Sequence, residues 1–354
     1  MIDFYNEQAE SYAEAKQKNG KLAIEDFISN DETKIKWVQN LMKDAENGIT
    51  HSVDIESFRY GLYRPFFKQH LYFNKDLNWT RSLQPKLFPT PSSKNLVISV
   101  TGLGGSKDFT LLMTNVIPDY QLQFNGQCFP LYYYEATGVS ELFTSETAKG
   151  YVRKDAVSDF ILSRCVAQYG KAVTKEDIFY YVYGFLHSPD YRTAFANDLK
   201  KTLPRLPLVD TAADFWAFSK AGRALAALHV EYESVPPYDG LTVTGTESGN
   251  YVVDKMKFPA KDRKDTILYN RAITIENIPL KAYEYIVNGK SAIEWIMERY
   301  AVTTHKASGI VNNPNLWAEE HNDPKYIFNL LLSVINLSVQ TVEIVEGLPK
   351  MKFE

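Results

Sequence analysis

Blocks of helical patterning alternate with blocks of strand patterning along this chain, and their order is the strongest constraint on the fold. Residues 1–54 and 151–233 have apolar side chains three and four positions apart, which predicts helices. Residues 55–150 and 234–280 contain β-branched and aromatic runs cut by Pro, Gly and Asn, which predict strands, and residues 281–354 are expected to be mostly helical. Because strands and helices do not alternate one by one, the order predicts an α+β fold. We expect a mixed β-sheet region with an inserted helical subdomain and flanking N- and C-terminal helices.

Several helix starts can be read from residues that cap a helix. The segments that begin at Thr174 and Ser291, TKED and SAIE, have the spacing of capping boxes, in which the first and fourth side chains bond each other's free backbone N–H groups. Ser188 followed by Pro189 predicts a helix with proline in its first turn, ending at Pro204 or Pro207. The other expected starts are Asp155, Asp210 or Thr211, and a position near 324.

The composition describes a globular protein and excludes several classes. Of 354 residues, 45% are hydrophobic and 23% are charged, and no stretch approaches the roughly 18 consecutive apolar residues of a membrane span. Cys128 and Cys165 lack the CxxC spacing of zinc or redox sites, which favours the reducing cytoplasm. The net charge of −4 argues against a protein that coats nucleic acid. A local basic face remains open at residues 255–264, KMKFPAKDRK, against the alternative of a solvated loop.

The run VISVTGLGGSKDF at residues 97–109 ends a predicted strand in a glycine-rich turn, which raises the question of phosphate binding. A P-loop requires GxxxxGK[ST], but here Lys107 follows Ser106 rather than glycine. A dinucleotide-binding turn requires GxGxxG, and the third glycine position after Gly102 and Gly104 is Lys107. Both patterns fail, and we interpret the segment as a turn that needs glycine at positive φ.

Catalytic motifs are missing from the sequence. The six histidines have no metal-ligand spacing, and no nucleophilic serine elbow, nuclease motif or methyltransferase motif is found. We therefore expect no catalytic residue, cofactor site or metal site in this segment.

A set of segments in a fixed order covers nearly the whole chain. They include MIDFYNEQ, YRPFFKQHLYF, SVTGLGGSKDF, IPDYQL, GQCFPLYYYE, DIFYYVYGFLHSPDYRTAFANDLKKTLPRLPL, DFWAFSKAGRALAALHVEYE, YNRAITIENIP, YEYIVNGKSAIEWIMERY and SGIVNNPNLWAEE. In this order they resemble the C-terminal specificity region of the Type ISP restriction-modification enzymes. In that family a nuclease, an ATP-driven translocase, an adenine methyltransferase and a target-recognition domain follow one another in one polypeptide.

The resemblance implies that residues 55–354 are the target-recognition domain and that residues 1–54 are a helical linker following an upstream methyltransferase. The implied function is sequence-specific recognition of double-stranded DNA. Recognition would position the target for adenine methylation and for ATP-driven translocation and cleavage by the upstream domains of the same polypeptide. The parent enzyme is then expected to use S-adenosylmethionine, ATP and Mg²⁺, and no membrane is expected as a partner.

Basic and polar side chains are the candidates for DNA contacts, because Arg and Lys pair with phosphates and guanine and Asn pairs with adenine. The candidates are Arg64, Lys68, Arg81, Ser106, Lys107, Asn250, Lys255, Lys257, Lys261, Arg263 and Lys264. Two alternatives stay open from the residues alone. One is an independent enzyme that binds a nucleotide at the glycine-rich turn, and the other is a scaffold whose aromatic surface binds proteins. The run YRPFFK at residues 63–68, for example, suits plain packing as well as phosphate contact.

Overall fold

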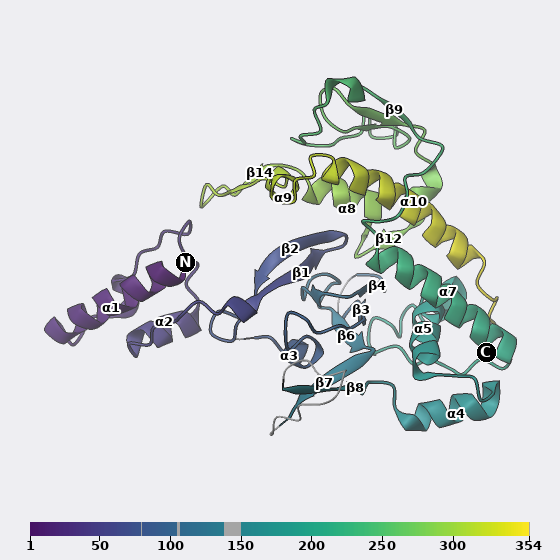
Figure 1. Cartoon of the computed structure of the whole chain (residues 1–354), viewed down its shortest axis with the longest axis horizontal. Helices are drawn as coiled ribbons and strands as arrows, with labels where there is room; N and C mark the ends of the chain where they lie inside the picture. Colours follow the sequence, from purple (N-terminus) through teal and green to yellow (C-terminus); the bar gives the residue numbers. More distant parts are fainter. Residues whose placement is uncertain (79, 105–106, 138–149, 354) are drawn as a thin grey trace. The chain divides into compact units, whose positions relative to one another are not determined.

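Figure 1 shows the computed structural model of the chain, which describes residues 1–78, 80–104, 107–137 and 150–353. The chain divides into two compact units. Unit 1 comprises Met1–Arg59, His70–Pro85 and Thr303–Asn312, and unit 2 comprises Tyr60–Gln69, Lys86–Val302 and Asn313–Glu354. Helices and small sheets both build the fold, so the α+β prediction is confirmed.

Unit 1 contains a pair of helices near the N-terminus. α1 (Ile2–Lys18), α2 (Gln39–Glu46) and the 3₁₀ helix η1 (Ile24–Asp26) share a small apolar core. Tyr5 and Tyr12 are fully buried in this core and donate hydrogen bonds of 2.9 Å to the carbonyls of Ile49 and Leu22. The helices expected within residues 1–54 are therefore present, as α1 and α2. Unit 1 also includes η2 (Ile55–Ser57) and the hairpin of β14 (Thr303–Thr304) and β15 (Val311–Asn312).

The strands form several small sheets. The first has the order β2-β1-β5, and in it β1 runs parallel to β5, whereas β3 is antiparallel to both β4 and β6 in the second. Two-stranded hairpins and the sheet β10-β11-β9 complete the set. The bounds of these strands are β1 (Phe58–Arg64), β2 (Phe67–Tyr72), β3 (Val97–Val100), β4 (Leu111–Thr114), β5 (Ile117–Pro118), β6 (Gln127–Pro130), β9 (Thr242–Thr244), β10 (Ile267–Leu268), β11 (Thr274–Glu276), β12 (Ile286–Val287) and β13 (Lys290–Ser291).

One strand lies where a helix is expected. β7 (Tyr132–Ala136) pairs with β8 (Tyr151–Asp155), so the prediction of helix throughout residues 151–233 is wrong at its start. The β-forming side chains of Tyr151 and Val152 and the pairing with β7 stabilise the extended backbone there. Asp155 is accordingly not the helix cap. Ser158 caps α4 (Asp159–Tyr169) instead, and its hydroxyl accepts a hydrogen bond from the N–H of Ile161.

The other helix-start signals are confirmed. Thr174 and Ser291 form capping boxes at the starts of α5 (Lys175–Phe185) and α8 (Ala292–Arg299), and Thr211 caps α7 (Ala212–Val230). α6 (Pro189–Ala194) has proline in its first turn, but it ends well before Pro204. The chain there turns at Asp198, whose carbonyl accepts from the N–H groups of Lys201 and Thr202. The remaining helices are α3 (Gln84–Leu87), α9 (Asn315–Glu320), α10 (Tyr326–Glu346), η3 (Thr246–Ser248) and η4 (Leu280–Glu284).

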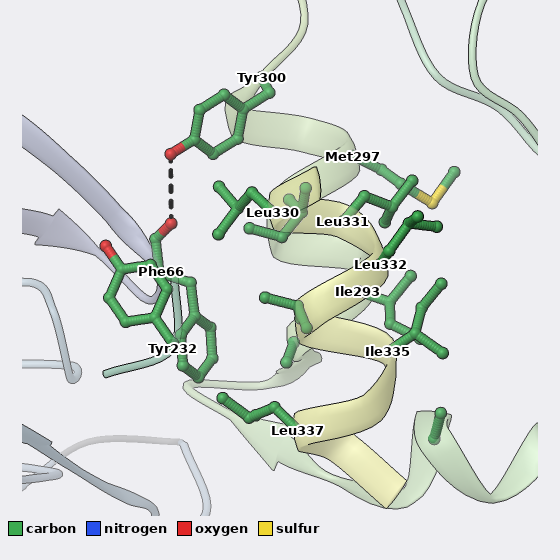
Figure 2. Close-up of a cluster of buried hydrophobic side chains, with 14 of the residues drawn as sticks. Phe66, Tyr232, Ile293, Met297, Tyr300, Leu330, Leu331, Leu332, Ile335 and Leu337 are labelled. Atoms are coloured by element: carbon green, nitrogen blue, oxygen red, sulfur yellow. Dashed lines mark hydrogen bonds between the residues drawn. The ribbon is translucent and has the colours of Figure 1, made fainter. Parts of the chain in front are cut away.

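α10 lies at the centre of the first core of unit 2, where it packs beside α8 (Figure 2). By length and composition α10 could cross a membrane, but 72% of its apolar window is buried inside the protein. Phe66, between β1 and β2, is also fully buried here although its φ is +59°, a value that L-residues rarely adopt. Its ring packs edge-on against Tyr232, and its carbonyl accepts a hydrogen bond from the hydroxyl of Tyr300. The aromatic rings of residues 66 and 67 therefore serve packing.

The second core of unit 2 is held by the crossing of α5 and α7, and it also includes β3 and β4. At this crossing a Cβ on Gly222 would lie 1.9 Å from the carbonyl oxygen of Tyr180, and a Cβ on Gly184 would lie 2.1 Å from that of Phe218. Only glycine allows the two backbones to approach so closely. The backbones of α5 and α7 are therefore in direct contact where the two helices cross.

Candidate nucleic-acid interface

Residues 255–264, which we call the basic strip, are mostly exposed and are joined to the small sheet β10-β11-β9 by a β-bridge between Lys257 and Leu268 of β10. Lys255 and Lys257 are exposed, whereas Met256 between them is only 2% exposed and belongs to the core. The backbone of Lys257 pairs with that of Leu268 in both directions, at 3.1 and 2.9 Å. This pairing fixes the alternation of side chains, so that the two lysines point away from the core.

The cations of the basic strip differ in how they are paired. Arg263 forms an ion pair with Asp265 at 2.9 Å, and Lys264 forms one with Glu294 at 3.0 Å. Burial raises the pKa of Glu294, but hydrogen bonds from Ser291 and Lys264 outweigh it and hold the pKa below its usual value. Within the part of the chain that the structure describes, Lys255, Lys257 and Lys261 are exposed and make no ion pair. These three lysines are available to phosphates.

Asn250 lies in the exposed loop just before the basic strip. Its side-chain oxygen accepts from the N–H of Val252 at 3.1 Å, and its carbonyl accepts from the amide of Asn270 at 2.9 Å. Both bonds hold the loop and leave the side-chain NH₂ of Asn250 exposed to solvent. An amide held in this way can donate to a base edge or to a phosphate.

The glycine-rich turn after β3 has only part of the expected geometry. Gly104 adopts a φ of +75°, as predicted, but its N–H donates to the carbonyl of Lys200, and the N–H of Gly102 donates to that of Phe124. These two N–H groups are therefore not free for a phosphate. Ser106 lies outside the described residues, and Lys107 is exposed.

Lys107 lies beside a hairpin turn from a distant part of the chain. Its Nζ is 3.0 Å from the position that a Cβ on Gly289 would occupy. Asn288 and Gly289 both have positive φ and connect β12 to β13, the geometry that the Asn-Gly pair favours. The N–H of Asn288 donates to the hydroxyl of Thr110, and its amide donates to the carbonyls of residues 121 and 122. Because residues 281–354 were expected to be mostly helical, this hairpin turn was not predicted, although an Asn-Gly pair is a typical hairpin signal.

Arg64 and Lys68 are engaged inside unit 2. Arg64 forms an ion pair of 2.8 Å with Asp119 and stacks on the ring of Tyr63 at 3.9 Å. Lys68 lies 2.5 Å from Glu233, whose other carboxylate oxygen accepts from the hydroxyl of Tyr326. A DNA phosphate would have to compete with these carboxylates, so both side chains suit packing better than DNA contact.

Arg81 belongs to unit 1, where its guanidinium lies 5.3 Å from the ring centre of Phe73.

Five of the eleven candidates therefore lie together in the basic strip, Asn250 precedes it, and the others lie on separate elements. No group of three or more His, Cys, Asp or Glu side chains among the described residues is arranged to hold a metal ion.

Comparison with known proteins gives a consistent result. The sequence profile of the Type ISP C-terminal specificity domain matches residues 1–330. The structure is similar to the ATP-dependent Type ISP restriction-modification enzyme LlaBIII bound to DNA, with 36% identity and a TM-score of 0.85 over 100% of this chain and 21% of that chain. It is also similar to a nuclease-deletion mutant of the Type ISP enzyme LlaGI in complex with a DNA substrate mimic, with 37% identity and a TM-score of 0.83 over 100% and 30% of the two chains.

A third similar structure is the DrdV–DNA complex, with 28% identity and a TM-score of 0.80 over 99% of this chain and 33% of that chain. No curated protein matches the chain. The chain thus spans a third or less of the length of these solved proteins. Because the profile covers more than nine-tenths of the sequence, the chain belongs to the family of Type ISP C-terminal specificity domains.

Proposed function

We propose that this chain recognises a specific sequence in double-stranded DNA as the specificity domain of a restriction-modification enzyme. The observation that carries the proposal is the basic strip, where Lys255, Lys257 and Lys261 are exposed and form no ion pair with any residue that the structure describes. The strip is held by the backbone pairing of Lys257 with Leu268 of β10 and by the buried side chain of Met256. A rigid support matters because base recognition requires side chains held in a defined register on the duplex. The similarity to enzymes solved with DNA supports the same function.

The contacts within the proposed interface divide into two kinds. The three lysines contact the phosphate backbone and supply affinity without sequence information. Asn250 and the exposed loop around it are the candidates for base readout, because an amide can pair with adenine in the major groove. Lys107 adds a further cation on a separate element.

The rest of the parent polypeptide would supply the catalysis. We infer that its other domains methylate adenine with S-adenosylmethionine and translocate and cleave DNA with ATP and Mg²⁺, in the cytoplasm. Recognition by this domain would then select the site of methylation, and the enzyme would extrude the target base.

The first experiment tests sequence specificity. The full chain is incubated with a pool of random duplexes, and the retained fraction is sequenced after several rounds of selection. A single consensus site is expected, with each mismatch weakening binding by about 1–3 kcal/mol. Retention without any enriched sequence, or no retention of duplex at all, would contradict the proposal.

The second experiment tests the basic strip. The triple change of Lys255, Lys257 and Lys261 to Ala is expected to reduce the slope of log affinity against log salt concentration by up to about 2.7, since each phosphate contact contributes about 0.9. The matched control changes Lys154, Lys175 and Lys281 to Ala. These three lysines already form ion pairs with carboxylates, so the control removes the same charge without removing a free cation. Equal slopes for the two triple variants would remove the basic strip from the interface.

A further inference from the structure

Residues 250–254, which we call the anchored loop, precede the basic strip, and a hydrogen bond reaches the carbonyl of every one of them. The side-chain amide of Asn270 donates to the carbonyls of residues 250 and 252, at 2.9 and 3.1 Å. The hydroxyl of the buried Tyr269 donates to the carbonyl of residue 251 at 2.8 Å. The N–H of Val302 donates to the carbonyl of residue 254 at 2.8 Å. Contacts with other segments of unit 2 therefore fix the backbone of this loop.

The remaining residue of the anchored loop, Val253, is held by a buried asparagine. The Oδ1 of Asn315 accepts from the N–H of Val253 at 2.9 Å, and the Nδ2 of Asn315 donates to the carbonyl of Val253 at 2.8 Å. A paired β-strand would make the same two kinds of bond, so one side chain here does what a neighbouring strand does in a sheet. Asn315 lies 62 residues further along the chain, at the start of α9.

The fixed backbone determines which side chains of the anchored loop face solvent. Val253 is fully buried in the first core of unit 2, whereas Val252 beside it is 61% exposed. Asn250 is exposed as well, and its side-chain oxygen accepts from the N–H of Val252. The fold thus holds an apolar side chain in water next to a polar amide. Contact with an apolar group of a partner would remove that surface from water.

The charges around Val252 indicate which partner this is. Asp254 is exposed and would repel a phosphate at that point of the loop. Lys255 and Lys257 follow, and both are exposed and suit the phosphates of a duplex. The distribution of charge therefore favours a base edge at Val252 and the DNA backbone at the lysines.

Among the base edges of the major groove, thymine is the one that adds a methyl group to the hydrogen-bonding atoms. We propose that Asn270 and Asn315 are positioning residues, which hold the anchored loop so that Val252 contacts the 5-methyl group of a thymine in the target DNA. The inference rests on the proposed function and identifies a specificity-determining residue for it. Val252 supplies the contact, and the two asparagines act through the backbone of the loop.

Replacing thymine by uracil tests the contact directly, because the two bases differ only in the methyl group. The consensus duplex obtained by selection is prepared with each thymine in turn replaced by uracil. The full wild-type chain is expected to bind about fourfold more weakly at one position, as for the loss of one buried methyl group. Val252→Ala should bind the thymine and uracil duplexes equally at that position. The matched control is Val53→Ala, which shortens a valine that is 55% exposed in unit 1 and should keep the wild-type preference.

The positioning role is tested by the ratio of two affinities, one for the thymine duplex and one for the uracil duplex. Both are measured on the same preparation, so the ratio does not depend on the fraction of the protein that is folded. Asn315→Leu should reduce the ratio to about 1. The matched control is Asn95→Leu, because Asn95 is also buried and makes the same pair of bonds with the backbone of Tyr132, at 3.1 and 2.7 Å. This control should keep the wild-type ratio.

Asn270→Asp provides a milder variant. Its carboxylate can still accept from the N–H groups of Ala272 and Ile273, as the asparagine does, but it no longer donates to the carbonyls of the anchored loop. The ratio should again fall towards 1. A wild-type ratio in Asn315→Leu and Asn270→Asp would overturn the positioning role. A consensus without a thymine whose replacement weakens wild-type binding, or an undiminished preference in Val252→Ala, would overturn the contact. Either result would leave sequence recognition standing, whereas failure to select any duplex would contradict the proposed function itself.

Discussion

The buried histidines of unit 2 should make the stability of the protein depend on pH between pH 7.5 and 5.5. His187 and His229 are 2% and 1% exposed. The Nδ1 of His187 donates to the carbonyl of Tyr183 at 2.8 Å. The hydroxyl oxygen of Tyr183 accepts a hydrogen bond from the N–H of Met113. The hydroxyl proton of Tyr183 is therefore donated to the Nδ1 of His229, at 2.6 Å. The Nε2 of His229 then carries its proton and donates to Thr341 at 3.0 Å. This network fits neutral imidazoles.

The protonated forms are disfavoured in the folded protein. Burial lowers the pKa of His229 to about 3. Burial, and next the charge of Arg192, lower the pKa of His187 well below its usual value of 6.5. The unfolded chain therefore binds more protons than the folded chain below pH 6.5. Stability is fully present above this pH and decreases as the pH falls through it.

The size of the expected stability loss follows from the protonation equilibria of the two histidines. At pH 5.5, one unit below the unfolded pKa, each histidine that stays neutral in the folded state reduces the free energy of unfolding by about 1.4 kcal/mol. The pair should therefore lower it by about 2.8 kcal/mol relative to its value well above pH 6.5. Such a change is a large fraction of the stability of a typical domain.

Urea unfolding at pH 7.5, 6.5 and 5.5 and constant ionic strength measures this effect. His229→Gln and His187→Gln should each remove about half of the pH dependence, whatever they do to stability at pH 7.5. His305→Gln replaces an exposed imidazole and is the matched control, expected to keep the wild-type profile. Equal unfolding free energies of the wild type at pH 7.5 and 5.5 would show that the histidine pair is not held neutral, and the reasoning from burial would fail.

Three further substitutions test other parts of the structure. Lys107→Ala should weaken duplex binding by about 1 kcal/mol in a mobility-shift assay without changing the melting temperature; unchanged affinity would exclude Lys107 from the interface. Phe66→Ala should lower the free energy of unfolding by about 3–5 kcal/mol in urea, because it empties a fully buried site, and a loss below about 1 kcal/mol would mean that the ring contributes little packing. Gly222→Ala should lower the free energy of unfolding by at least about 1–3 kcal/mol, because the new Cβ would overlap the carbonyl of Tyr180. Ala221→Gly is the comparison, because it changes the neighbouring residue of the same helix without creating that overlap.

Local signals in the sequence predicted much of the helical structure. The capping boxes at Thr174 and Ser291, the proline at the start of α6 and the apolar pattern of α10 all depend on residues within a few positions of one another. Such signals act through groups that are close in sequence, so they can be recognised from the amino-acid sequence without the tertiary structure. The end of α6 and the strand β8 were predicted wrongly, because competing turns and a partner strand decided them.

The candidate site was less accessible to prediction. The sequence shows the basic strip as a dense run of cations, and its role in DNA binding stays a prediction. The sequence could not distinguish exposed Lys257 from Lys264, which is paired with a carboxylate 30 residues away. It likewise could not show that Arg64 and Lys68 meet Asp119 and Glu233, which lie 55 and 165 residues from them. Ion pairs of this kind depend on which segments the fold brings together.

The sequence by itself determined the alternation of helical and strand regions, the helix caps and the ordered segments of the family, because these follow from local periodicity and residue order. Only the tertiary structure decided which cations are paired with carboxylates and why Phe66 accepts a left-handed backbone. The physical reason is that burial and charge pairing are properties of neighbours in space, and in this fold many of those neighbours are distant along the chain.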